Sequence, residues 1–131
     1  KSNMDSGMFQ PLQAAAAAAL ALPDSWYEEI NSVYSRRRIL AAKIMNALSC
    51  TFAESQSGLF LWGKIPGGFS DAEELTEELL HRNHLFVTPG SVFGRNGRRH
   101  IRISLCASEE LLSGALIRVR ERVITNQLKT A

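Results

Sequence analysis

Apolar side chains recur every three or four residues in three parts of the chain, which is the spacing of one face of an α-helix. These stripes predict helices over about 25–49, over about 70–82 and from residue 109 onward. A fourth helix is predicted over 10–21, where alanine, the strongest helix former, dominates. The residues expected to face inward are Trp26, Ile30, Val33, Leu40, Ile44 and Leu48, then Leu75, Leu79 and Leu80, then Leu112, Leu116, Val119 and Val123.

Two helix starts carry a capping pattern, in which a Ser is followed three residues later by a Glu. The pattern occurs at 25–28 (SWYE) and at 70–73 (SDAE). In such a pattern the Ser and Glu side chains each satisfy a free backbone N–H group. The sequence therefore predicts Ser25 and Ser70 as the N-caps of two helices.

Short apolar runs between turn residues predict four strands, at 50–54, 58–62, 84–88 and 100–105. In the last run apolar and polar residues alternate, so one face is apolar and the other carries Arg102. The elements follow in the order helix, helix, strand, strand, helix, strand, strand, helix. Because the strands come in pairs, we expect an α+β fold, with a small antiparallel or mixed sheet of about four strands packed against helices.

Arg102 is the candidate for chemistry, because a planar guanidinium on a strand can bind a carboxylate through two parallel hydrogen bonds. The alternative is an ordinary solvated or ion-paired arginine. The nearby arginines at 95, 98 and 99 are most simply a solvated hairpin tip, as 36–38 are a solvated helix face. A basic hairpin of Arg95, Arg98, Arg99 and Arg102 that binds nucleic-acid phosphates is a competing hypothesis. A domain used only for binding a partner protein is another.

Composition places the chain among ordinary globular domains. It has 131 residues, of which 45% are hydrophobic and 21% charged, enough for one domain with a modest core. The net charge of +2 gives little support to a nucleic-acid partner, and no apolar run approaches the length of a membrane span. Cys50 and Cys106 form neither a metal pattern nor a disulfide framework, so we expect buried thiols and a cytoplasmic protein. His81 and His84 lack further ligands at metal spacing, and we predict no metal site.

Several motifs occur together in one order. They are SGLFLW at 57–62, FVTPGSVFG at 86–94 and HIRIS at 100–104, with DSGMF at 5–9 upstream. In this combination they resemble the C-terminal part of class I and II aminotransferases of pyridoxal-phosphate fold type I. The resemblance covers nearly the whole chain. His100 departs from it, since the family usually has a tyrosine or phenylalanine there.

The resemblance implies roles for individual residues. Arg102 would hold the α-carboxylate of the substrate, and Gly58 and Phe60 would belong to a strand whose aromatic side chain approaches the substrate. Gly90 would lie in a loop near the mouth of the active site. Residues near the start would lie close to the subunit interface; they are Asn3, Asp5 and Ser6.

The resemblance also implies an organisation. Residues 1–22 would be the junction segment and alanine-rich helix that leave a cofactor-binding domain, and 23–131 the C-terminal small domain. The parent enzyme would be a homodimer that uses pyridoxal 5'-phosphate to exchange amino groups between an amino acid and a 2-oxo acid, without a nucleic-acid or membrane partner. The chain begins at Lys1, and no lysine in it matches the Schiff-base lysine of the family. We therefore expect a fragment that is inactive alone.

Overall fold

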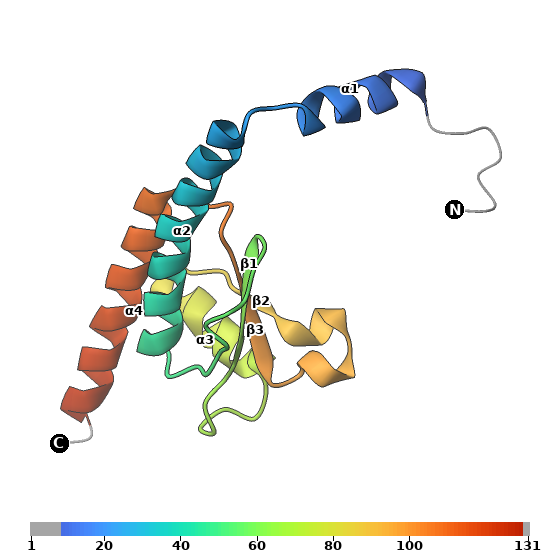
Figure 1. Ribbon diagram of the computed structural model, residues 1–131. Helices are drawn as coiled ribbons and strands as arrows, with labels where there is room; N and C mark the ends of the chain where they lie inside the picture. Colours follow the sequence, from blue (N-terminus) through green and yellow to red (C-terminus); the bar gives the residue numbers. More distant parts are fainter. Residues whose placement is uncertain (1–8, 130–131) are drawn as a thin grey trace. The chain divides into compact units, whose positions relative to one another are not determined.

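The computed structural model describes residues 9–129, and their side chains as far as Glu121. These residues form four α-helices, three strands and two short 3₁₀ helices (Figure 1). None of the helices in the described part is long and apolar enough to cross a membrane. The elements are α1 (Gln10–Leu20), α2 (Asp24–Ala47), β1 (Phe60–Lys64), α3 (Ala72–Asn83), β2 (Thr88–Pro89), η1 (Gly90–Phe93), η2 (Arg95–Gly97), β3 (His100–Ser104) and α4 (Glu109–Lys129).

The chain divides into two compact units, residues 1–33 and 34–131. In the described part of the first unit, α1 confirms the helix predicted from the alanine run, with a proline in its first turn. The Tyr27 hydroxyl donates a hydrogen bond of 2.7 Å to the carbonyl oxygen of Ala19. Its ring meets that of Trp26 edge-to-face, with centroids 5.0 Å apart. These contacts hold the turn after α1.

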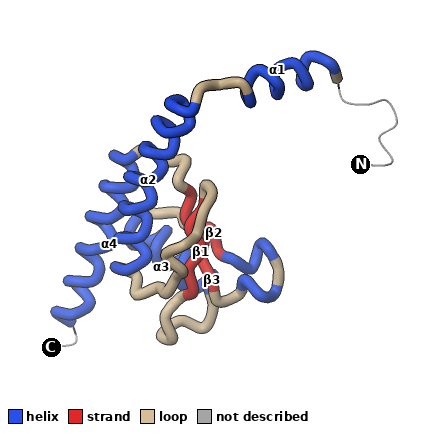
Figure 2. Tube along the Cα trace, viewed as in Figure 1, coloured by secondary structure: helices blue, strands red, loops and turns tan. Residues whose placement is uncertain are grey.

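The second unit is built on an antiparallel sheet with strand order β1-β3-β2, which Figure 2 shows in red. Arg102 lies on the central strand, β3, where it is paired with Trp62 of β1 on one side and with Thr88 of β2 on the other. Helices α2, α3 and α4 cover one face, which confirms the predicted α+β class. The core consists of Ala41, Ile44, Met45, Leu48, Cys50, Leu61, Ile65, Ala72, Leu75, Leu79, Val87, Ile101, Ile103, Leu105, Leu112, Ala115, Leu116 and Val119.

The sheet of the described residues has three strands rather than the four expected. The segment predicted as a strand at 50–54 makes only one bridge, in which Thr51 and Lys64 exchange two backbone hydrogen bonds of 2.8 and 2.9 Å. The next outward-facing backbone groups of β1 belong to Trp62, and the side-chain amide of Gln56 binds both of them. Because a side chain occupies the position of a neighbouring strand, the ladder stops there.

The strand predicted at 84–88 is also shorter, since β2 begins only at Thr88. His84 ends α3 in a left-handed conformation with φ of 49°. The N–H of Leu85 still donates to the Leu79 carbonyl oxygen at 3.2 Å. Backbone that closes a helix end cannot join a ladder at the same time, so the end of α3 delays β2.

Neither predicted N-cap is confirmed. Helix α3 is capped by Asp71, not Ser70, and the Asp71 carboxylate accepts from the Glu74 N–H at 3.1 Å. Glu74 in turn accepts from the Ser70 N–H and hydroxyl, and these two hydrogen bonds lower the pKa of Glu74. Helix α2 begins at Asp24, so Ser25 lies inside its first turn. Asp is as good a cap as Ser, and neighbouring candidates cannot be ranked by pattern alone.

Some residues predicted to face inward are exposed. Trp26 and Ile30 are 44% and 38% exposed, and Leu80 is 38% exposed. On α2 the buried stripe instead consists of Ala41, Ile44 and Met45. Val123 lies outside the described side chains. Helical spacing identifies a face, but only the packing of neighbours decides how far along the helix that face is covered.

The two cysteines differ in environment, which corrects the prediction that both are buried: Cys50 is buried and Cys106 is exposed. Burial raises the pKa of the Cys50 thiol from 9.0 to about 11, because the thiolate would lose its hydration.

We expect a maleimide at pH 8 to label Cys106 in the folded protein and Cys50 only after denaturation. The unfolded chain releases the Cys50 proton first, so the free energy of unfolding should fall as the pH rises from about 9 to about 11. Equal labelling of both thiols before denaturation, mapped by peptide mass, would contradict this prediction.

Candidate functional site

The face of the sheet turned away from the core carries polar and aromatic side chains. Strand alternation puts Leu61, Ile101 and Ile103 in the core and leaves the intervening residues on the other face. We call this second set the open face. In register it consists of Phe60 opposite Ser104, Trp62 opposite Arg102, Lys64 opposite His100, and Thr88 on the far side of Arg102.

The Arg102 guanidinium packs against two phenyl rings at the centre of this face. Its Cζ lies over the ring of Phe60 at 4.1 Å from the centroid, and over the ring of Phe93 at 4.3 Å. None of the described residues forms a hydrogen bond or ion pair with this guanidinium. A ring under a guanidinium stabilises its charge without occupying its N–H groups, which lie in the guanidinium plane. The N–H donors of Arg102 thus remain available to an anion.

An aromatic layer continues beside this pair. Trp62 meets Phe93 edge-to-face at a centroid distance of 5.8 Å, and His100 stacks on Trp62 at 5.4 Å with 15° between the ring planes. The Nδ1 atom of His100 is buried without a hydrogen-bond partner among the described residues. The His100 ring thus packs on Trp62. A tyrosine or phenylalanine, which is usual at this position in the family that the motifs resemble, has a planar ring that can pack in the same way.

The segment from Gly90 to Gly97 brings Phe93 to this site. The backbones of Gly90 and Gly97 approach so closely that a Cβ atom on either glycine would collide with the other residue. At Gly90 the added Cβ would also lie 2.7 Å from the His100 carbonyl oxygen and 2.7 Å from Cη2 of Trp62. Gly94, with φ of 120°, turns the chain between η1 and η2. Only glycine permits this compact loop, which folds back over the open face.

Phe60, the other ring, depends on how the chain enters β1. Gly58 has φ of 86°, and its carbonyl oxygen accepts a 2.6 Å hydrogen bond from Arg38 Nη2 on α2. Gln56 binds the backbone N–H and C=O of Trp62 at 2.9 and 2.8 Å. The predicted residues Phe60 and Arg102 are therefore in contact, whereas Gly58 acts by directing the chain that leads to Phe60.

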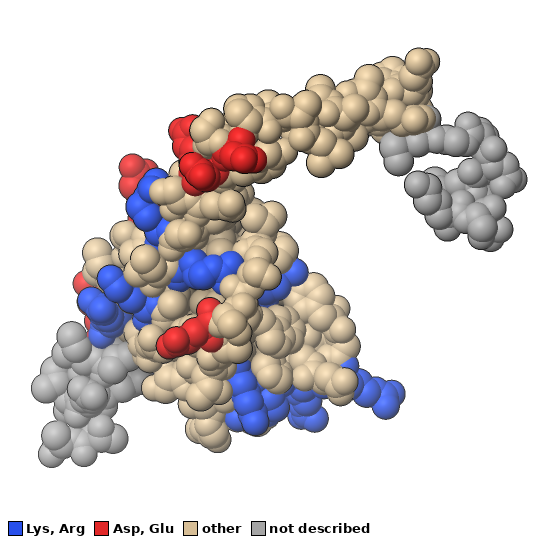
Figure 3. All heavy atoms as spheres, in the orientation of Figure 1, with Lys and Arg blue, Asp and Glu red and all other residues tan. Residues whose placement is uncertain are grey.

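The remaining arginines do not form one basic surface with Arg102. Arg99 donates to the carbonyl oxygens of Phe69, Ser70 and Pro66, so it closes the 65–70 turn and is not part of a solvated tip. Arg98 lies 3.5 Å from an Asp71 carboxylate oxygen. Figure 3 shows the Lys and Arg side chains of the second unit in separate groups on the visible face. This arrangement does not favour the nucleic-acid hypothesis.

The arginines of α2 also differ from the solvated face predicted for 36–38. Arg36 pairs with Glu109 at 2.9 Å, and Arg37 donates to the Leu105 carbonyl oxygen at 3.2 Å. With the Arg38 hydrogen bond described above, they link α2 to the start of α4 and to the adjoining ends of β1 and β3. These three residues therefore tie α2 to the ends of the two strands that carry Phe60 and Arg102.

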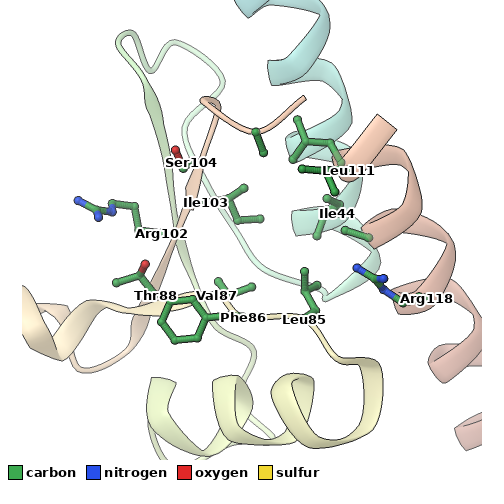
Figure 4. A pocket seen from close by; sticks show the side chains of 13 residues that line it. Ile44, Leu85, Phe86, Val87, Thr88, Arg102, Ile103, Ser104, Leu111 and Arg118 are labelled. Carbon is green, nitrogen blue, oxygen red and sulfur yellow. The ribbon is translucent and has the colours of Figure 1, made fainter. Parts of the chain in front are cut away.

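A groove of about 400 Å³ lies on the other side of the sheet, among α2, α4 and the segment that leads to β2. It is mostly apolar, with Phe86, Leu111 and Ile44 among its lining residues. Figure 4 shows that the Arg102 side chain points away from this groove, opposite to Ile103. Arg102, Thr88 and Ser104 are nevertheless among the residues that line the groove, so it adjoins the strands that carry the open face.

The sequence comparison decides the family. Residues 2–119 match the family described as aminotransferase class I and II. The chain belongs to this family. Members of the class I and II aminotransferase family generally use pyridoxal phosphate, in agreement with the resemblance of the TPGSVFG and HIRIS motifs.

Known aminotransferases match the chain in sequence and in fold. It is 34% identical to an LL-diaminopimelate aminotransferase of Oleidesulfovibrio alaskensis, over 91% of this chain and 30% of that protein. It is 33% identical to the transaminase BacF of Bacillus subtilis, over 88% of this chain and 29% of BacF. A solved aminotransferase from Staphylococcus aureus superposes with a TM-score of 0.73 at 35% identity, over 92% of this chain and 32% of the other. The chain thus spans about 30% of the length of these relatives.

The described residues do not fit pyridoxal phosphate by themselves. A lysine that can form a Schiff base and groups that cradle a phosphate would be needed, and Arg102 packs on the phenyl rings of Phe60 and Phe93. Lys43 lies exposed on α2, and Lys64 lies exposed at the end of β1. We therefore derive no reaction step through the cofactor from these residues.

The predicted site residues fall into three groups. Arg102 and Phe60 meet, while Gly58 and Gly90 shape the segments that carry Phe60 and Phe93. Three predicted residues lie outside the described part of the chain: Asn3, Asp5 and Ser6. The sequence analysis missed Phe93, Trp62, Gln56 and Arg38. The sequence signal for Phe93 was its place in the FVTPGSVFG motif, a glycine-rich loop that precedes the Arg102 strand.

Proposed function

We propose that this chain is the substrate-carboxylate-binding domain of a pyridoxal-phosphate-dependent aminotransferase and that Arg102 binds the α-carboxylate of the substrate. The observation that carries the proposal is a guanidinium held by the Phe60 and Phe93 rings, whose N–H groups have no acceptor among the described residues. A cation in this state is ready for an anion, and membership in the family makes an amino acid or 2-oxo acid the natural ligand.

A carboxylate suits Arg102 better than it would suit a lysine. Two parallel N–H···O bonds fix the orientation of the carboxylate as well as its position. The adjacent phenyl rings lower the local dielectric constant, which strengthens the charged contact. A fixed carboxylate in turn fixes the Cα atom, whose hydrogen must point in one direction for proton removal.

The rest of the proposed enzyme would supply the covalent chemistry. When bound, pyridoxal phosphate acts as the electron sink that stabilises a carbanion at Cα. We propose that its lysine and phosphate-binding groups lie in a separate domain, that residues 1–22 form the junction to it, and that the enzyme is a cytoplasmic homodimer. Placing the carboxylate receptor on a different domain allows substrate binding to drive closure and exclude water.

The test compares an amino acid with the amine that lacks its carboxylate, for example tyrosine with tyramine or phenylalanine with phenethylamine. We expect the purified full-length protein to transfer the amino group of at least one amino acid to a 2-oxo acid. It should prefer that amino acid over the matching amine by about 100-fold in kcat/KM, since a charged bidentate contact is absent with the amine. Transfer from amines at the same rate, or no transfer across a panel of the common amino acids, would refute the proposal.

A further inference from the structure

Phe93 and Phe60 are both exposed aromatic residues. Phe93 is 53% exposed and Phe60 is 40% exposed, so neither residue is part of the core. Both rings nevertheless contact the same cation at nearly the same distance, 4.1 Å for Phe60 and 4.3 Å for Phe93. Two exposed rings that pack on the same cation form a contiguous apolar patch, and such patches are typical of ligand-binding sites.

The two rings reach Arg102 by different routes. Phe60 lies on β1, in the same sheet as Arg102, whereas Phe93 ends η1 and comes from the loop. The loop is closed by hydrogen bonds from the Gly94 N–H to Ser91 and from the Gly97 N–H to Gly94, each 2.9 Å long. Trp62 supports the Phe93 ring from the side at 5.8 Å. Phe93 is thus held in place from outside the strand that carries Arg102.

We infer that Phe93 is a positioning residue of the carboxylate receptor, which orients the Arg102 guanidinium and shields its face from water. The inference rests on the proposed function of Arg102. Arginine has four rotatable side-chain bonds and no hydrogen-bond partner among the described residues, so packing is what restricts it. Without the Phe93 ring, Arg102 would sample more rotamers, and a carboxylate would have to order it on binding.

The effect should fall on carboxylate binding rather than on the chemical step. In a Phe93 variant Arg102 is still present and still orients the bound carboxylate. The cost of ordering its side chain is met when the substrate binds, so KM rises and kcat stays nearly unchanged. Loss of a cation–π contact in a partly desolvated site corresponds to a decrease in binding affinity of about 3- to 30-fold. We therefore expect Phe93→Leu to raise KM for the amino acid about tenfold.

The experiment uses the full-length enzyme with an amino acid and its matching amine. Phe93→Leu should reduce the preference for the amino acid over the amine about tenfold, because only the amino acid uses Arg102. Phe93→Tyr keeps the ring and should retain the preference of the unmodified enzyme, and Val92→Ala, next in the chain, should leave it unchanged.

A double variant with Arg102→Ala should show no further loss from Phe93→Leu, as expected for residues that act through one contact. Phe93→Met serves as a second ring-free variant, with the thermal midpoint measured for each.

The outcomes separate the two proposals. If Arg102→Ala leaves the preference intact, the carboxylate role of Arg102 fails, and the inference fails with it. If Arg102→Ala abolishes the preference but Phe93→Leu and Phe93→Met retain it, only the positioning role of Phe93 is overturned. Equal losses for the amino acid and the amine in the Phe93 variants would indicate a merely structural role and would also overturn the inference.

Discussion

Arg102→Ala is expected to lower kcat/KM of the full-length enzyme for its amino acid by 2–3 orders of magnitude, mainly through a higher KM. This corresponds to about 3–4 kcal/mol of lost contact with the carboxylate. The change removes a cation that has no hydrogen bond or ion pair within the described residues and that packs on two partly exposed rings. Folding should therefore be largely unaffected. Steady-state kinetics with the amino acid varied, together with a thermal unfolding curve, measures both effects.

Arg102→Lys separates charge from geometry. An ammonium group keeps the positive charge but cannot donate two parallel hydrogen bonds in a plane, and it packs less well against a phenyl ring. We expect kcat/KM to stay well below that of the unmodified enzyme. Recovery of most of the activity with lysine would show that the site needs only a positive charge. An unchanged kcat/KM in Arg102→Ala would refute the assignment altogether.

Gly90→Ala is expected to destabilise the fold by about 3 kcal/mol or more, which is at the upper end for added bulk in a packed site. The new Cβ would collide with the carbonyl oxygen of Gly97 and would lie 2.7 Å from both the His100 carbonyl oxygen and Trp62 Cη2. Two of these atoms are backbone and cannot rotate away. The loop must open, and Phe93 must move with it, so KM for the amino acid should rise as well. Urea unfolding of the full-length protein and steady-state kinetics provide the measurements.

Gly67→Ala is the matched control, because nothing lies within 4 Å of a Cβ at that exposed position. Its free energy of unfolding should stay within about 0.5 kcal/mol of the unmodified protein. If Gly90→Ala behaves like this control in both stability and KM, the close approach of Gly90 and Gly97 is not needed for the site.

Local patterns in the sequence were sufficient for the helices and for the strand that carries Arg102. In α3 and α4, apolar residues three and four positions apart lie on the same face of the helix. Leu75, Leu79 and Leu112 are buried on these faces, as predicted. Alternation along 100–104 places Arg102 opposite the core, because successive side chains of a strand point to opposite faces. These features depend on neighbours in the chain, so the order of residues contains the information. The same holds for the motifs that indicated the family.

The tertiary structure alone decided which groups surround Arg102 and how far each element extends. Phe93 reaches the guanidinium across a loop, Gln56 replaces a strand beside Trp62, and Arg99 turns inward to close the 65–70 turn. Each of these contacts joins backbone segments whose separation depends on how the whole sheet and its loops pack. A hydrogen-bonding side chain has many possible acceptors, and the sequence does not rank them. The position of Arg102 on the open face was thus determined by local alternation. Its aromatic surroundings, and the lack of an acceptor for its N–H groups among the described residues, were determined only by packing.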